Sequence, residues 1–242
     1  AAIIVITAGA NQKPNETRLD LVQKNAKIMT DVVTQIKEQE YKGILLIVSN
    51  PVDIMTQVAM EVSGFPEHRV FGSGTVLDSA RLRYHLGQHL GVDSRSVHAF
   101  VIGEHGDSEI AAWSSANVSG VPLNSFCEMR GHFNHEGNTE SIEEQVKNSA
   151  YEIIAKKDAT YYGIAMVVKR ICQAIVRDEK SIFPISLRMH GEYALEDVVL
   201  SMPAIVGARG IETTIPISLD EKEVSRLHES AEMLRETRKE IR

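Results

Sequence analysis

I-L-L-I-V-S-N-P-V-D, residues 44–53, joins a continuous apolar run to a polar turn. An apolar run without alternation is typical of a strand that is buried on both faces of a sheet. Pro51 keeps Asn50 extended and suits the first turn of a helix, so we expect the Asn50 side chain at the end of this strand. Residues 2–7 form a second such run, and the segment between the two runs carries apolar residues at helical spacing. This order predicts a parallel sheet with crossover helices.

The rest of the chain predicts more short strands and helices. A strand at 69–71 and a helix at 78–90 precede a buried strand at 97–102. Asp220 and Glu223 have the spacing of a capping box, which predicts a terminal helix. Between these regions we expect, in chain order, antiparallel strands within 109–118 and at 121–123, a polar loop at 127–139, a helix at 141–178 kinked near 157–158, and strands at 182–188, 193, 198–201 and 215–219.

The composition is that of an ordinary globular protein. Hydrophobic residues make up 43% of the chain and charged residues 24%, and no apolar run approaches the roughly 20 residues of a membrane span. The formal net charge of -7 argues against a nucleic-acid surface, which would carry Lys and Arg in excess. Two cysteines without metal-ligand spacing fit a reducing cytosol. We therefore expect a cytoplasmic protein without a metal, nucleic-acid or membrane partner.

V-I-G-E-H-G-D-S, residues 101–108, is the segment where we expect the chemistry. Gly103 and Gly106 bracket an acid and a histidine at the end of a buried strand, which leaves His105 with little steric cover. Strand ends are where α/β proteins place their sites. A lone histidine in a polar turn has no such meaning, so the interpretation depends on the residues that accompany His105.

Several polar groups follow strands or lie in loops, and a doubly wound sheet would bring them to one edge: the 12–18 loop, Asn50, Asp78 with Arg81, and His105. Asp78 and Arg81 are three residues apart on a helix, hence on one face. A carboxylate near an imidazole raises the pKa of the ring, which makes His105 a proton donor near neutral pH. Arg81 has the planar fork that binds a carboxylate, and Arg18 can close over a substrate and polarise a carbonyl.

Four motifs carry a resemblance: T-A-G-A-N-Q-K-P-N-E-T-R-L-D-L, V-S-N-P-V-D, L-D-S-A-R-L-R and G-E-H-G-D-S. In this order and spacing they resemble the L-lactate dehydrogenase family, close to its allosteric bacterial members, and the resemblance extends from Ala1 into the terminal helix. It implies an α/β fold made of the second half of a doubly wound parallel (Rossmann) sheet, residues 1–72, and an α+β catalytic domain, residues 73–242. The first βαβ half, with its glycine-rich turn and the acid that binds the adenosine ribose, is expected to be absent.

The resemblance implies an enzyme that uses NAD to interconvert pyruvate and L-lactate, in glycolysis and fermentation. His105 would be the proton donor and acceptor, with Asp78 as its partner. The other implied roles are substrate-carboxylate binding by Arg81, carbonyl polarisation by Arg18, contacts to substrate and nicotinamide ribose by Asn50, lining of the substrate pocket by Thr160, a nicotinamide contact by Ile164, and backbone contacts to NAD by Gly9, Ala10, Val48, Ser49 and Asn50.

Gln12 is the residue on which the expected choice of substrate depends. The related malate dehydrogenases carry an arginine at this loop position to bind a second carboxylate, and a glutamine leaves a dicarboxylate without its counter-charge. Pyruvate is therefore preferred to oxaloacetate, with malate or another L-2-hydroxy acid as the alternative and longer 2-oxo acids still open. A further alternative, of a different class, is a truncated non-catalytic subunit that acts only in oligomer interactions.

Arg83 and His98 match the positions at which allosteric bacterial lactate dehydrogenases bind fructose 1,6-bisphosphate between subunits. Two basic groups from each chain would meet their symmetry mates around the sugar bisphosphate. The resemblance thus implies a homotetramer with fructose 1,6-bisphosphate as an activator. The alternative is a solvated arginine and an ordinary strand histidine.

Overall fold

The computed structural model describes residues 1–10, 18–157 and 161–241 of the chain. No helix in these ranges combines the length and the apolar character needed to cross a bilayer. The strands are β1 Ile3–Ile6, β2 Ile44–Ile47, β3 Val70–Gly72, β4 Val97–His98, β5 Val101–Ile102, β6 Ile110–Ala111, β7 Asn117–Val118, β8 Val121–Pro122, β9 Ser181–His190, β10 Glu196–Gly207 and β11 Gly210–Thr214. The α-helices are α1 Arg18–Glu38, α2 Val52–Ser63, α3 Val76–Leu90, α4 Leu123–Met129, α5 His135–Lys157, α6 Tyr162–Val176 and α7 Glu221–Lys239. The 3-10 helices are η1 Glu67–Arg69, η2 Ser94–Ser96, η3 Trp113–Ser115 and η4 Glu192–Ala194.

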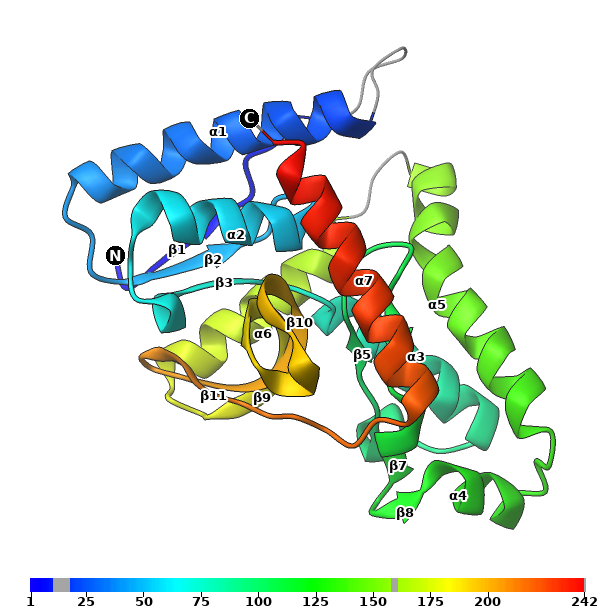
Figure 1. The fold of residues 1–242 in the computed structure, drawn as a ribbon. Helices are drawn as coiled ribbons and strands as arrows, with labels where there is room; N and C mark the ends of the chain where they lie inside the picture. The colour runs from blue at the N-terminus through cyan, green and yellow to red at the C-terminus, as the bar shows by residue number, and fades with distance from the viewer. Residues whose placement is uncertain (11–17, 158–160, 242) are drawn as a thin grey trace.

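One sheet contains β1, β2, β3, β9, β10 and β11 in that order (Figure 1). β1, β2 and β3 are parallel, because α1 and α2 return the chain to the same edge each time. β9 joins β3 in the antiparallel sense where Gly72 faces Ser186, and β10 and β11 continue antiparallel. The α/β class and the parallel sheet up to Gly72 are therefore confirmed. The expected absence of a first βαβ half stays a prediction.

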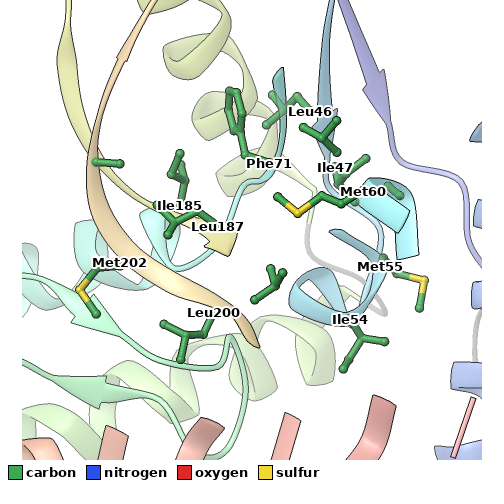
Figure 2. Close-up of a cluster of buried hydrophobic side chains, with 14 of the residues drawn as sticks. Leu46, Ile47, Ile54, Met55, Met60, Phe71, Ile185, Leu187, Leu200 and Met202 are labelled. Atoms are coloured by element: carbon green, nitrogen blue, oxygen red, sulfur yellow. The ribbon is translucent and has the colours of Figure 1, made fainter. Parts of the chain in front are cut away.

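The hydrophobic core around this sheet is formed by side chains from both the N-terminal and the C-terminal part of the described chain. All residues of β2 are buried, as their continuous apolar run predicts. Figure 2 shows the cluster in which β2, α2, β3, β9 and β10 place Leu46, Ile47, Ile54, Met55, Met60, Phe71, Ile185, Leu187, Leu200 and Met202. Each such side chain stabilises the fold by roughly 1.5–3 kcal/mol when fully buried. Strands that precede and follow the middle of the chain thus depend on one another.

A second apolar cluster surrounds α3 and corrects one expectation. Residues 97–102 form two strands, β4 and β5, instead of one. β4 pairs with β7 and β5 with β6, so the run lies outside the six-stranded sheet. Val97, Ala99 and Val101 are still buried, because α3, α4 and α5 contribute side chains to the same cluster. An apolar run indicates that a segment is buried. Burial alone does not distinguish one strand of the main sheet from two short strands outside it.

The expected polar loop at 127–139 is wrong in most of its length. α4 continues to Met129, and α5 already begins at His135. The Asn134 side chain accepts the Gly137 N–H at 3.3 Å, as an N-cap residue does, so the Asn- and Gly-rich composition marks a helix start. The helix expected at 141–178 is two helices, α5 and α6, and the expected kink lies where α5 ends.

The strands expected at 182–188 and 198–201 are confirmed as parts of the longer β9 and β10. The strand expected at 215–219 is wrong, because β11 ends at Thr214 and the described residues 215–219 contain no strand. The Tyr193 hydroxyl donates to the carbonyl of Ile217 at 2.6 Å in this segment. Tyr193, also expected in a strand, lies in η4 with a φ of 53°.

Helix α7 confirms the capping box and lies beside β10, as Figure 1 shows. The Asp220 side chain accepts the Glu223 N–H at 2.8 Å, and the Glu223 carboxylate accepts the Asp220 N–H at 2.9 Å. Leu227, Ala231 and Leu234 are buried on the face that packs against the sheet. The cap thus fixes the start of a helix that contributes to the main core.

We predict that Asp220→Ala lowers the free energy of unfolding by about 1 kcal/mol, because the Glu223 N–H loses its acceptor. The shift in the urea midpoint of circular dichroism unfolding measures this change. Lys222→Ala, at an exposed position in the same turn, is the matched control and should leave the midpoint unchanged. Equal midpoints for both variants would contradict a stabilising role of the cap.

Candidate active site

His105 lies just beyond β5, on a segment that is fixed by backbone hydrogen bonds. Gly103 has a φ of 83°, a conformation that favours glycine, and a Cβ there would lie 2.9 Å from the Ser230 hydroxyl. Gly103 pairs with Ser201 of β10, and the Glu104 N–H donates to the Ser230 hydroxyl at 2.8 Å. His105 is therefore held by β10 and α7, not by the edge of a parallel sheet as the sequence suggested.

Asp78, in the first turn of α3, contacts both other members of the expected trio. The Nδ1 atom of His105 donates to Asp78 Oδ2 at 2.7 Å, and Arg81 Nη1 donates to Asp78 Oδ1 at 3.1 Å. The Asp78 side chain is only 4% exposed, whereas that of His105 is 29% exposed. Because Nδ1 is occupied by Asp78, Nε2 is the ring nitrogen left for a ligand.

The Asp78 carboxylate controls the charge of the His105 ring. Burial alone lowers the pKa of an imidazole, but the charge and hydrogen bond of Asp78, helped by Asp53 and Glu109, raise the pKa of His105 to about 9. Burial of Asp78 is likewise outweighed by His105 and Arg81, which hold the pKa of its carboxyl below the usual value. The protonated ring stabilises the folded state fully below the ordinary histidine pKa, and this stabilisation is lost as the pH rises through about 9.

Glu109 is a third ionisable group at this site, and the sequence analysis missed it. One side-chain atom from each of Asp78, His105 and Glu109 lies within 4.8 Å of the other two. Burial, with repulsion from Asp78, raises the pKa of Glu109 to about 8, so this acid is protonated at neutral pH. Within this cluster His105 and Asp78 are joined by a direct hydrogen bond. The signal of Glu109 in the sequence is an acid that begins an apolar run.

The ends of β1 and β2 lie together, as expected for the groups assigned to the cofactor. The Asn25 side chain accepts the Ala10 N–H at 2.7 Å and donates to the Asn50 carbonyl at 3.0 Å. Ser49 donates from its hydroxyl to the Ile6 carbonyl at 3.2 Å, which ties the two strand ends again. The Asn50 side chain is on an exposed residue that precedes a cis peptide bond to Pro51. The structure therefore places the backbone of 9–10 and 48–50 at one edge.

Asn25 and Asp53 are buried polar residues that the sequence analysis did not select. Asn25 lies three residues after Val22 and four before Met29, on the buried face of α1. Asp53 lies in a run of buried residues that opens α2. In both cases the available signal was a polar residue at a position that helical spacing assigns to the core.

Some expected site residues lie apart or outside the description. Gln12 and Thr160 lie outside the described residues, and Arg18 is described only as the first residue of α1. Ile164 packs against the main core from the first turn of α6.

Arg83 and His98 line a separate cavity of about 760 Å³, which Arg95 and Arg170 also line. The Arg83 guanidinium donates to the Ala99 carbonyl at 3.3 Å, and burial lowers its pKa. His98 is exposed on β4. The two residues expected to bind an activator are therefore brought together, away from the His105 cluster.

Two family descriptions match the chain. "Lactate/malate dehydrogenase, NAD binding domain" matches residues 1–72, and "lactate/malate dehydrogenase, alpha/beta C-terminal domain" matches residues 75–242. The curated L-lactate dehydrogenase of Acetivibrio thermocellus is 49% identical over 234 residues, which are 97% of this chain and 74% of that protein. The L-lactate dehydrogenase of Thermoanaerobacterium saccharolyticum is 47% identical over 241 residues, covering 100% and 78%.

Solved structures agree with these matches. A lactate dehydrogenase enzyme from a Medee basin deep-sea metagenome library superimposes with a TM-score of 0.96 at 45% identity, covering 99% of this chain and 76% of its own. The minor L-lactate dehydrogenase of Enterococcus mundtii gives a TM-score of 0.96 at 42% identity, covering 100% and 77%.

We predict that Asp78→Asn lowers the pKa of His105 from about 9 toward the ordinary histidine value, because burial is then opposed only by the charges of Asp53 and Glu109. Titration of the ring Cε1 signals by NMR in labelled protein measures the change, with His105→Gln assigning the signal. The His98 signal, from an exposed residue of β4 that is not among the groups acting on His105, serves as the internal control. A wild-type His105 that titrates at the ordinary value would contradict the electrostatic account.

Proposed function

The chain belongs to the lactate/malate dehydrogenase family, and we propose that it catalyses the NAD-dependent interconversion of pyruvate and L-lactate. The observation that carries this function is the contact of one buried carboxylate, Asp78, with both His105 and Arg81. A charged proton donor and a carboxylate-binding fork are thereby held side by side. The curated relatives are named L-lactate dehydrogenases. Their names do not favour the two alternatives, a malate dehydrogenase and a non-catalytic subunit.

The residues at the ends of β1 and β2 fit the nicotinamide end of NAD. Asn25 holds the backbone of Ala10 and Asn50 together at the carboxyl edge of parallel strands, where dinucleotides bind in sheets of this kind. We assign the backbone contacts to Gly9, Ala10, Val48, Ser49 and Asn50, and a side-chain contact to Ile164. When bound, NADH supplies the hydride that reduces the carbonyl carbon.

Arg81 orients the substrate, and His105 provides the proton. Two parallel hydrogen bonds from the Arg81 guanidinium hold the carboxylate of pyruvate, each contributing on the order of 1.5–3 kcal/mol. Nε2 of His105 donates its proton to the carbonyl oxygen, which leaves a hydroxyl group and a neutral ring. The negative charge of Asp78 stabilises the ring before transfer and fixes its orientation. The reverse reaction returns the proton to Nε2.

The remaining substrate contacts complete this proposal. Arg18 polarises the carbonyl, Asn50 holds the substrate beside the ribose, and Thr160 lines the pocket. Gln12 provides no charge for a second carboxylate, so a monocarboxylate is preferred. We further propose that the two domains divide after residue 72, that the protein is a homotetramer, and that it is located in the cytoplasm. The free thiols of Cys127 and Cys172 support a cytoplasmic location.

Fructose 1,6-bisphosphate is proposed as an activator that binds near Arg83 and His98. These residues and two further arginines line one cavity, which concentrates positive charge where a bisphosphate needs it. The cavity is also lined by Val76, Leu77 and Ala80, on the first turns of the helix that carries Asp78 and Arg81. A ligand there is thus one helix away from the catalytic pair.

We predict that the chain oxidises NADH with pyruvate faster than with oxaloacetate, and that Gln12→Arg reverses this preference. The ratio of kcat/KM values should change by a factor on the order of 10–100, the value of one charged hydrogen bond. Loss of NADH absorbance with each substrate measures the ratio. Gln35→Arg adds the same charge at an exposed position of α1 and should leave the ratio unchanged. Faster reduction of oxaloacetate by the unchanged chain would refute the assignment.

We predict that fructose 1,6-bisphosphate lowers the pyruvate concentration at half-saturation by a factor on the order of 10, a usual size for allosteric coupling. Arg83→Gln should remove this shift, because Arg83 lines the cavity and belongs to α3, the helix that also carries Asp78 and Arg81. Arg177→Gln, at the exposed end of α6, changes net charge equally and should retain the shift. Superimposable saturation curves with and without the bisphosphate would exclude activation.

A further inference from the structure

Asp53 is a fully buried acid whose bonds lead away from its own helix. It lies in the first turn of α2 and is 1% exposed. Oδ2 accepts the backbone N–H of His105 at 2.8 Å, and Oδ1 accepts the Ser186 hydroxyl at 2.6 Å. The Ser201 hydroxyl lies 3.4 Å from the same Oδ1 atom. The carboxylate therefore joins α2 to β9, β10 and the His105 segment.

These bonds complete a set that fixes the backbone on both sides of the catalytic ring. The successive N–H groups of residues 103, 104 and 105 donate to the Ser201 carbonyl, the Ser230 hydroxyl and the Asp53 carboxylate. Of these acceptors only Asp53 carries a charge, and charged acceptors form the stronger hydrogen bonds. Asp78 fixes the ring and Asp53 the backbone of the same residue.

Asp53 is also three residues after Asn50, the proposed contact to substrate and ribose. Because α2 begins between them, a displacement of the start of α2 would move Asn50 and the acceptor of His105 together. Asp53 thus links the positions of Asn50 and His105, the two groups proposed to contact the same substrate. Misplacement of reacting groups by about 1 Å can lower the rate on the order of 100-fold.

We propose that Asp53 is a positioning residue of this site: its carboxylate sets the location of His105 relative to Asn50 and adds a second negative charge behind the ring. This inference rests on the proposed function for its kinetic consequence, but its effect on His105 is independent of turnover. The ionisable groups that act on Asp53 are His105 and Glu104, and those that act on His105 include Asp78, Asp53 and Glu109. Burial raises the pKa of Asp53 to about 6, so the acid is ionised at neutral pH.

Two substitutions separate the positional role from the charge. Asp53→Asn keeps both bonds, since the amide oxygen can accept from His105 and the amide nitrogen can donate to the Ser186 hydroxyl, which can also accept. Asp53→Ala leaves the His105 N–H without an acceptor. Ser63→Ala removes a buried hydroxyl bond at the far end of α2 and is the matched control.

We expect Asp53→Ala to lower kcat for pyruvate reduction by a factor on the order of 10–100 while changing the KM for NADH far less. We expect Asp53→Asn to keep kcat within about threefold at neutral pH and to lower the pKa of His105, measured by NMR, by about half a unit or more, because one of two nearby charges is gone. The alkaline limb of the kcat profile should move by the same amount. Ser63→Ala should change none of these.

A purely structural role predicts lower stability with an unchanged His105 titration. A folded Asp53→Ala protein with the kcat of the wild type would overturn the positional role. If that variant does not fold, Asp53→Asn decides, since a His105 signal that titrates as in the wild type would refute the proposal. An inactive wild-type chain would instead contradict the proposed function, and the NMR comparison would still test Asp53.

Discussion

A carboxylate that is removed from water needs a positively charged partner. The contacts of Asp78 with His105 and Arg81 meet this need, and the rest of the site depends on them. Its side chain is almost fully buried, so leaving it ionised without a cation would cost several kcal/mol. α3 supplies Arg81 three residues later, and the glycine turn after β5 supplies His105. The same two groups that neutralise the acid are those that a 2-oxo acid needs. The contacts that stabilise the buried charge of Asp78 are therefore the same contacts that hold His105 protonated for the proposed proton transfer.

The sheet explains why this arrangement is reproducible. β9 and β10 lie beside the parallel strands and bring Ser186 and Ser201 beneath the His105 segment. α7 packs against β10 and adds Ser230 from the opposite side. His105, the proposed proton donor, is thus supported by elements that also form the main core.

Local signals in the sequence predicted much of the fold and the central trio. The β1 and β2 runs, the capping box at Asp220 and the spacing of Asp78 and Arg81 are each readable within a few residues, and the structure agrees with them. The 97–102 run failed because apolar character reports burial without naming the partner strand. Asp53 was missed because its meaning comes from a serine far along the chain, and only the β3–β9 junction brings the two together.

The junction of β3 with β9 has a consequence for how the protein is made. Asp53 and Ser186 are 133 residues apart in sequence, and Asp53 and Ser201 are 148 apart. Contacts of such long range form late, because the intervening chain must first be ordered. During synthesis, β1 to β3 leave the ribosome well before β9 and β10 are made. Asp53 therefore has no hydrogen bond from Ser186 or Ser201 until those strands are present. Assembly of the hydrogen bonds that support His105 therefore requires that β9 and β10 have been synthesised and have packed beside the parallel strands.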